Sequence, residues 1–207
     1  GTGLLSTNPV EAGGCARTDP ALTEPHVQSH MIPARVGVES KGIVWGRGYF
    51  ADVCLLKPAS RGRLTIKKNG SGFIPHIDFK ALGHEGDRDR IIAAFKLLRS
   101  IMNSKPMQAL GPFEESPGAD VQSDDAILAH CRKRLGTAYH PVGTCRMGAT
   151  DDPRSVVDPD LRVIGLDNVR VVDASVMPEI IAGNTNAPTM MIGETAAAKI
   201  KGQPVPG

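Results

Sequence analysis

The sequence has no long apolar run of the kind that crosses a membrane. A membrane-spanning helix needs about 20 consecutive apolar residues, and no stretch of this chain approaches that composition. The beginning of the sequence also lacks the basic, apolar and small-residue regions of a secretory signal. We therefore expect a cytoplasmic protein, or one bound peripherally to the inner membrane. Because the first residue is Gly1 rather than methionine, we expect a processed or excised chain.

An excess of charge of one sign is also absent. The 24 Lys and Arg residues nearly balance the 22 Asp and Glu residues, so the formal net charge is +2. Hydrophobic residues make up 41% of the chain, more than a disordered segment contains. The densest basic run, Arg132–Arg134, falls at the end of a predicted helix, where cations are favourable. These features speak against a disordered tail and against a nucleic-acid-binding protein.

Cysteine is scarce and shows no metal-binding or redox spacing. The four cysteines are Cys15, Cys54, Cys131 and Cys145. No two of them form a C-x-x-C pair, so we expect reduced thiols rather than a zinc site. His76 and His84 lie near each other in the sequence, but no cluster of carboxylates or cysteines accompanies them. We therefore predict no metal site.

The first half of the sequence predicts an antiparallel β-meander. The run Tyr49–Leu56 is rich in strand formers, and Arg63–Lys67 alternates polar and apolar residues. Between them, Lys57–Gly62 contains Pro and Gly placed to reverse the chain. The dipeptide Asn69-Gly70 marks another turn before a further strand, Phe73–Phe79. Connections this short join antiparallel strands only.

The segment Asp87–Met102 predicts a helix that packs on this sheet. Its apolar residues recur at spacings of three and four, which gives one continuous stripe. The members of the stripe are Ile91, Phe95, Leu98 and Met102. We expect these four side chains to be buried against the strands, in a fold of the α+β class.

A second helix is predicted after Ser123, whose hydroxyl can cap the N-terminus. Basic residues in its last turn and Gly136 beyond it favour an end there. The expected apolar face consists of Ile127, Leu128, Cys131 and Leu135.

The last third of the chain predicts two short strands and a final helix. The strands are expected at Leu161–Ile164 and Val169–Val172, around a turn. The helix is expected at Pro188–Lys201, because Pro suits a first helical turn and Gly202 suits a helix end.

Two segments could carry chemistry. In the first, a loop with Pro and two glycines follows Tyr139 and presents His140, whose imidazole can exchange a proton near neutral pH. In the second, Asp173 ends a predicted strand, and an Asn-rich loop leads into a helix N-terminus that favours anions. From position and spacing alone, a structural loop histidine and a well-capped surface helix with a strand-end Asp are the favoured interpretations of these patterns.

Taken together, these segments resemble the glucose–methanol–choline (GMC) oxidoreductases, flavoenzymes that oxidise alcohols. The matching segments are His140–Gly148, Val157–Pro159, Leu161–Val163, Val171–Pro178 and Gly183–Glu194, with weaker similarities at Glu11–Gly13, Pro58 and Ser60–Gly62. Within the family, the sequence is most similar to bacterial FAD-dependent alcohol and choline dehydrogenases.

The resemblance implies how the chain is divided. Residues 1–155 would be the C-terminal part of a substrate-binding domain, with an antiparallel sheet and packed helices, and residues 156–207 would complete the FAD-binding domain. The family's G-x-G-x-x-G fingerprint is missing, because Gly1–Gly3 and Gly46–Gly48 lack the third glycine. A further N-terminal FAD domain would hold most of the adenosine and pyrophosphate, so we expect the isolated chain to be colourless and inactive toward alcohols.

The resemblance also implies catalytic roles for two residues. His140 would accept the hydroxyl proton of a primary alcohol, or hydrogen-bond the developing alkoxide, as hydride passes to the flavin. Asn184 matches a position that is His in some members and Asn in others. An amide is not a base, so Asn184 would orient the alcohol oxygen.

Four further residues would bind the cofactor by the same resemblance. Asp173 and Ala174 would lie near the FAD ribityl and diphosphate groups. Asn186 and Pro188 would belong to the loop over the pyrimidine edge of the flavin.

Two other interpretations stay open at this point. The chain could be a stand-alone binding or assembly module without catalysis, or one half of a split enzyme. An upstream reading frame for the flavin domain would distinguish part of an alcohol dehydrogenase from a stand-alone module. With aromatic residues at 4%, no pocket identifies the alcohol, which is choline-like, aliphatic or aromatic. The electron acceptor, quinone or oxygen, is equally open.

Overall fold

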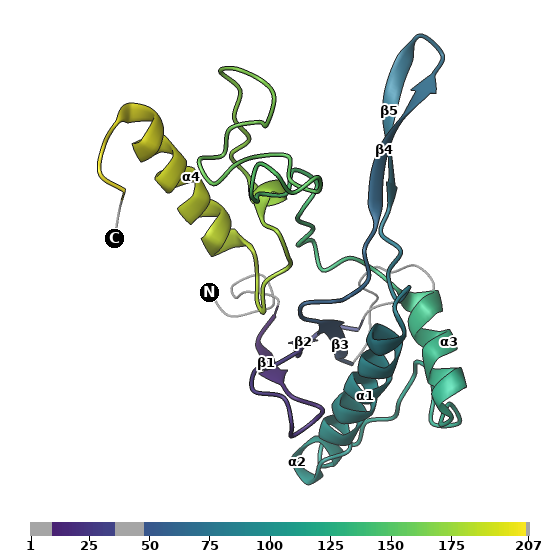
Figure 1. Ribbon diagram of the computed structural model, residues 1–207. Helices are drawn as coiled ribbons and strands as arrows, with labels where there is room; N and C mark the ends of the chain where they lie inside the picture. Colours follow the sequence, from purple (N-terminus) through teal and green to yellow (C-terminus); the bar gives the residue numbers. More distant parts are fainter. Residues whose placement is uncertain (1–9, 36–47, 206–207) are drawn as a thin grey trace. The chain divides into compact units, whose positions relative to one another are not determined.

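The computed structural model describes residues 10–35 and 48–205 of the chain (Figure 1). The elements in chain order are β1(Ala12–Ala16), β2(Val27–Ile32), β3(Phe50–Leu55), β4(Arg63–Asn69), β5(Gly72–Asp78), α1(Glu85–Met102), α2(Lys105–Gln108), α3(Asp124–Arg134), the 3₁₀ helix η2(Ala174–Val176) and α4(Asn186–Lys201). They form two compact units. The first unit runs up to Ser60 and resumes over Ala81–Gly136, and the second contains Arg61–Lys80 and the chain from Thr137 onward.

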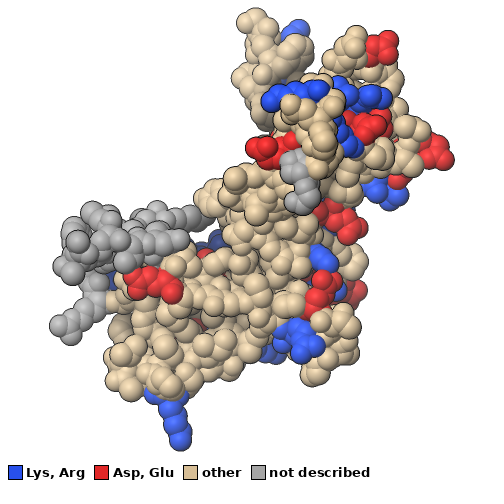
Figure 2. Space-filling model, turned by 90° about the vertical axis from the view of Figure 1, so that its left-hand side faces the viewer, with Lys and Arg blue, Asp and Glu red and all other residues tan. Residues whose placement is uncertain are grey.

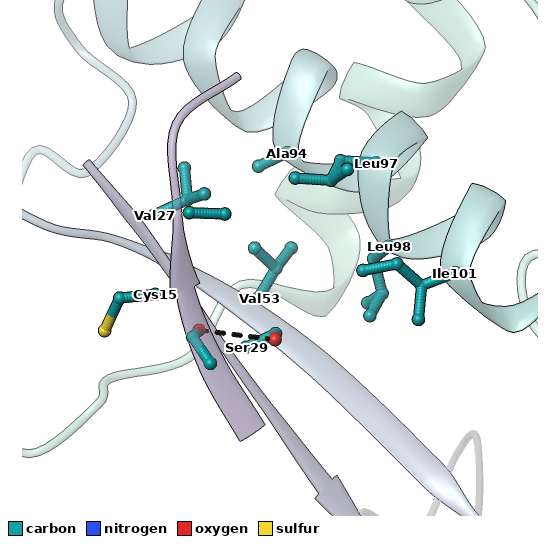
Figure 3. A pocket seen from close by; sticks show the side chains of 10 residues that line it. Cys15, Val27, Ser29, Val53, Ala94, Leu97, Leu98 and Ile101 are labelled. Carbon is teal, nitrogen blue, oxygen red and sulfur yellow. Dashed lines mark hydrogen bonds between the residues drawn. The ribbon is translucent and has the colours of Figure 1, made fainter. Parts of the chain in front are cut away.

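The first unit is a three-stranded antiparallel sheet covered on one face by α1. Its strand order is β1-β2-β3, and the register aligns Gly14 with Ser29 and Ser29 with Val53. Side chains on this face and on α1 surround a mostly apolar cavity of about 210 Å³ (Figure 3). Its lining includes Val27, Val53, Ala94, Leu97, Leu98 and Ile101. Burial of this face explains why α1 stays on the sheet, since apolar area removed from water is the main stabilising contribution.

The predicted meander is wrong in its strand pairing. The strand β3 pairs over six residues with β2, not with β4, and β4 pairs with β5 in a separate two-stranded sheet. The segment 57–62 leads out of the three-stranded sheet, and Asp87 at the start of α1 accepts hydrogen bonds there from the backbone N–H groups of Ala59 and Ser60. Strand pairing depends on such distant contacts, which a local turn signal does not contain.

The apolar stripe of α1 is confirmed in part. Ile91 is buried, whereas Phe95, Leu98 and Met102 are half-buried, and the most buried residue of the helix is Ala94. The ring of Phe95 meets the imidazole of His130 on α3 edge-on, with 5.8 Å between the ring centres. The stripe is therefore shared between the sheet and α3 rather than buried against strands alone.

The predicted caps of two helices are confirmed. The hydroxyl of Ser123 accepts the N–H of Ala126 at the start of α3, and Gly202 ends α4 in the left-handed conformation with φ 64°. The helix α4 begins at Asn186, so Pro188 lies in its first turn as expected. The predicted face of α3 is too long by one residue, because Leu135 lies beyond the helix and is 42% exposed.

The second unit has a small core formed by side chains far apart in the sequence. Val157, Leu161, Val176 and Ala196 are buried together, with Met147, Val163, Val171 and Ile192 packed around them. The helix α4 therefore contributes its inner side to a core made largely of loop residues.

The two strands predicted next to this core are paired but are not regular strands. Val163 donates its N–H to the carbonyl of Val169, and Val171 donates its N–H to the carbonyl of Leu161. These two hydrogen bonds form a single isolated antiparallel bridge between Arg162 and Arg170. Leu161 and Asn168 have φ values of 66° and 61°. Since this left-handed backbone cannot continue an extended strand, the pairing ends after three residues.

The strands β4 and β5 form a long hairpin that closes at Gly70, as the Asn-Gly signal predicts (Figure 1). On one face the register pairs Leu64 with Ile77, Ile66 with Pro75 and Lys68 with Phe73. Ile66 and Phe73 are 70% and 73% exposed. The hairpin thus has one apolar face open to solvent.

Charged residues of both signs share the face drawn in Figure 2. On the face drawn in Figure 2, lysine and arginine side chains lie beside aspartate and glutamate. Within the described residues, no helix is long and apolar enough to cross a membrane.

Candidate active site

The loop that follows His140 is held by backbone hydrogen bonds in the second unit. Cys145 donates its N–H to the carbonyl of Ser175, and Met147 donates to Val176, with N···O distances of 3.0 and 2.8 Å. Val176 is fully buried. The loop is therefore fixed to the core of the unit by main-chain contacts, which require no particular side chains and left no sequence signal beyond the motif itself.

A tight turn presents the His140 ring. Tyr139 donates its backbone N–H to the hydroxyl of Thr137 at 2.9 Å and adopts the left-handed conformation, with φ 63°. Such backbone is uncommon for a non-glycine residue and is typical of functional loops. The ring of His140 is half-buried, and its Nδ1 lies 2.9 Å from the hydroxyl oxygen of Thr185.

This contact joins the two segments that the sequence singled out. His140 and Thr185 are 45 residues apart in the chain. Thr185 lies directly between Asn184 and Asn186, so the ring of His140 meets the Asn-rich loop at its centre. Asn184 itself is exposed.

Thr185 is the residue that sequence reasoning missed. A threonine just before a helix is ordinarily interpreted as an N-cap, and Thr185 is indeed the N-cap residue of α4. Its side chain makes no capping hydrogen bond and contacts His140 instead. The position of Thr185 within the Gly183–Glu194 motif was the only signal that could have identified it.

The predicted cofactor residues near η2 have structural partners. Asp173 does not end a strand; it is the N-cap of η2, and its carboxylate accepts the N–H of Ser175 at 2.7 Å. The carboxylate is exposed, and Ala174 beside it is half-buried. This arrangement fixes one carboxylate oxygen and leaves the group open to a further donor.

The other two predicted cofactor residues lie in the first turn of α4. The side-chain amide of Asn186 contacts the sulfur of Met190 at 3.8 Å, a weak acceptor. Because Thr185 does not cap the helix, the N–H groups of Asn186 and Ala187 receive no side-chain oxygen from it. Pro188 restricts the backbone of this turn. The turn offers donors suited to an electron-rich acceptor.

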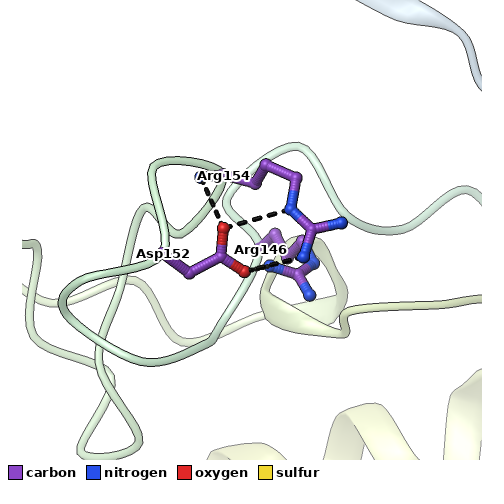
Figure 4. Close-up of polar contacts among 3 residues, drawn as sticks. All are labelled: Arg146, Asp152 and Arg154. Carbon is purple, nitrogen blue, oxygen red and sulfur yellow. Dashed lines mark hydrogen bonds and ion pairs between the residues drawn. The ribbon is translucent and has the colours of Figure 1, made fainter.

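An ion cluster braces the chain between the His140 loop and the buried Val157 (Figure 4). The carboxylate of Asp152 accepts from Arg154 at 3.0 Å and from Arg146 at 2.9 Å. The hydrogen bonds from Arg154 and Arg146 hold the pKa of Asp152 well below its usual range. Asp152 therefore stays ionised across the physiological pH range and accepts charge-assisted hydrogen bonds from both arginines.

The remaining candidates from the sequence do not join the site. His84 caps α1 by accepting the N–H of Gly86, and His76 lies on β5. None of the four cysteines forms a disulfide. In the described ranges, 10–35 and 48–205, no three His, Cys, Asp or Glu side chains gather in a way that could hold a metal.

Comparisons with known proteins agree on one family. The family model for GMC oxidoreductase, C-terminal, matches residues 58–193. An alcohol dehydrogenase [acceptor] of Pseudomonas putida is 46% identical over 195 residues, which cover 94% of this chain and 35% of that protein. An oxygen-dependent choline dehydrogenase of Rhizobium rhizogenes is 38% identical over 98% of this chain and 37% of its own length.

Solved structures give the same result. Pyridoxine 4-oxidase from Mesorbium loti superposes with a TM-score of 0.83 at 32% identity, over 95% of this chain and 38% of that one. An FAD-dependent oxidoreductase from Chaetomium thermophilum superposes with a TM-score of 0.71 at 29% identity, over 86% of this chain and 28% of that one. The chain thus spans little more than a third of the length of the curated relatives that it matches. With the His140 and Asn184 motifs joined in one unit and a family model over most of the sequence, this chain belongs to the GMC oxidoreductases, a family of FAD-binding flavoproteins.

Proposed function

We propose that the chain is the C-terminal part of an FAD-dependent alcohol oxidoreductase, with His140 as its base. The single observation that carries this proposal is the 2.9 Å contact between His140 and Thr185, which joins the histidine motif to the loop that contains Asn184.

Among the described residues, only one ring nitrogen of His140 forms a hydrogen bond. Its Nδ1 is engaged with Thr185, and within the described residues no hydrogen bond is formed by Nε2. Nε2 would accept the proton of a primary alcohol, while the amide of Asn184 orients the alcohol oxygen. When bound, FAD supplies the hydride acceptor. Proton transfer of this kind contributes typically 10²–10⁴ in rate.

The first turn of α4 and the start of η2 fit an electron-rich cofactor. Asn186 has a weakly engaged amide, and the N–H groups at the start of α4 receive no cap from the side chain of Thr185. The partial positive charge there would favour negative charge at a flavin edge by about 0.3–1 kcal/mol. Asp173 and Ala174 would face the ribityl and diphosphate, and Pro188 would hold the loop beside the pyrimidine edge.

The domain division and partners are parts of the same proposal. Residues 1–155 would belong to the substrate-binding domain, and residues 156–207 would complete the FAD domain. An N-terminal FAD domain would supply the rest of the cofactor site. The substrate would be a choline-like, aliphatic or aromatic alcohol, and the electron acceptor a quinone or oxygen. We place the protein in the cytoplasm or at the periphery of the inner membrane.

The decisive experiment combines the chain with the FAD domain of a relative and measures flavin absorbance and alcohol turnover. We expect the chain alone to be colourless and the combination to be yellow and active. His140→Ala should lower turnover about 10²-fold or more. Asn184→Ala should have a smaller effect, because it removes one hydrogen bond that stabilises the transition state by about 1–3 kcal/mol. His76→Ala on β5 is the matched control. Full turnover in His140→Ala would contradict the proposal, and a combination that never binds flavin would favour a non-catalytic module.

A further inference from the structure

Thr185 departs from the ordinary behaviour of a helix N-cap. A Ser or Thr at this position normally accepts the N–H of the second or third helical residue, as Ser123 does at the start of α3. Thr185 has a helical backbone instead, with φ −85° and ψ −4°, and its side chain caps nothing. A local rule that is broken without compensation in the helix itself points to a role elsewhere.

The hydroxyl of Thr185 is held against His140. Thr185 is 6% exposed, and a buried hydroxyl ordinarily has a hydrogen-bond partner. Among the described residues, that partner is Nδ1 of His140, at 2.9 Å. The position of Thr185 is fixed by its own carbonyl, which accepts the N–H and the hydroxyl of Thr189 at 3.0 and 2.6 Å.

We infer that Thr185 is a positioning residue for His140: it accepts the Nδ1–H of the ring and thereby keeps Nε2 unprotonated. The inference rests on the proposed role of His140 as a base. A hydroxyl can accept or donate, but donation to Nδ1 would place the ring proton on Nε2, where a base needs its lone pair. The hydrogen bond from Nδ1–H to the Thr185 hydroxyl also persists after Nε2 takes up a proton. The imidazolium keeps its Nδ1–H, and the hydrogen bond becomes charge-assisted.

The first test measures the ring tautomer in the 207-residue chain itself, by ¹⁵N NMR of labelled histidine at a pH where His140 is neutral. In the unmodified chain we expect Nδ1 to carry the proton and Nε2 to be bare. Thr185→Val should abolish this preference, and Thr185→Ser, which keeps a hydroxyl, should restore it. Thermal unfolding would reveal whether Thr185→Val impairs folding. In that case Thr185→Ala, which also removes the hydroxyl, takes its place.

Thr195→Val is the matched control, because Thr195 lies on the same helix and its hydroxyl contacts Met191 rather than His140. The inference would be overturned if Thr185→Val and Thr185→Ala both had the same tautomer distribution as the control Thr195→Val.

The second test measures turnover in the chain combined with an FAD domain. Thr185→Val should lower kcat about 10- to 100-fold, the worth of one hydrogen bond to a charged group, with little change in KM. Thr185→Ser should recover most of that loss. Unchanged kcat in Thr185→Val beside a strong loss in His140→Ala would refute the inference alone. Unchanged turnover in His140→Ala would refute the proposed function, and the tautomer measurement would still decide whether Thr185 orients the ring.

Discussion

At the scale of single residues, the most consequential buried group is Asp87. It is 1% exposed, and its carboxylate accepts from the N–H of Ala59 at 2.9 Å and from the N–H and hydroxyl of Ser60. A buried carboxylate is tolerated only when its oxygens are hydrogen-bonded in this way. Asp87 thereby anchors the segment at which the chain leaves the three-stranded sheet.

Asp87→Asn should destabilise the first unit by about 2 kcal/mol. The change removes a charged acceptor and leaves a backbone donor without an equivalent partner. Urea unfolding followed by circular dichroism would measure the loss. Asp89→Asn, an exposed change on the same helix, should leave the free energy of unfolding within about 0.5 kcal/mol.

The carboxylate of Asp87 should also make the free energy of unfolding of the first unit depend on pH in the acidic range. Burial by itself would raise the pKa of Asp87, but the hydrogen bonds from Ser60 and Ala59 outweigh it, and the folded pKa is lowered. The unfolded chain, with a pKa of about 3.9, then binds more protons, so stability rises with pH in this window. The contribution is present above about pH 4 and is lost as pH falls through the folded pKa. Unfolding titrations should show this acid loss in the unmodified chain and in Asp89→Asn, and a smaller loss in Asp87→Asn.

At the scale of secondary-structure elements, the two serine N-caps of the first unit make a matched comparison. Ser123 caps α3 with its hydroxyl, whereas Ser104 at the start of α2 makes no side-chain capping bond. Ser123→Ala should therefore cost about 1 kcal/mol of stability, and Ser104→Ala should cost almost nothing. Equal losses in chemical unfolding would show that the capping bond of α3 contributes no stability.

The base of the β4–β5 hairpin depends on Gly62. A Cβ atom at this position would lie 2.2 Å from the carbonyl oxygen of Asp78 and 2.8 Å from the Cα of Phe79. Gly62→Ala should therefore push the strands apart and cost about 1–3 kcal/mol of local stability. Gly72→Ala is the control, since its nearest neighbour is 3.8 Å away. Hydrogen exchange of the hairpin amides should accelerate only in Gly62→Ala.

At the scale of the whole molecule, the open apolar face of that hairpin should govern solubility. An isolated two-stranded ribbon with exposed apolar side chains is prone to association. Combining Ile66→Thr with Phe73→Thr should reduce light scattering at high protein concentration while leaving the unfolding midpoint of the first unit unchanged. Lys67→Thr, on the other face of the same strand, should not reduce it. Equal scattering in all three proteins would exclude this face as the source of association.

The α+β class and the ends of the helices could be predicted because their signals are local. The hydroxyl of Ser123, the proline at position 188 and the glycine at position 202 act on neighbouring backbone. The partner of β3 could not be predicted, because β2 is about 20 residues away and its alternation is weak. The strands expected at 161–172 failed for a related reason, since left-handed Leu161 and Asn168 interrupt them.

The sequence by itself determined the family, since the motifs from His140 to Glu194 carry that resemblance in their order and spacing. Only the tertiary structure decided that Thr185 turns its hydroxyl away from α4 and onto His140, and that Asp87 is buried where it accepts the N–H of Ser60. Each of these hydrogen bonds joins residues at least 27 positions apart. Side-chain partners at such separations are set by packing of the whole unit, because a local segment contains no record of what will lie beside it.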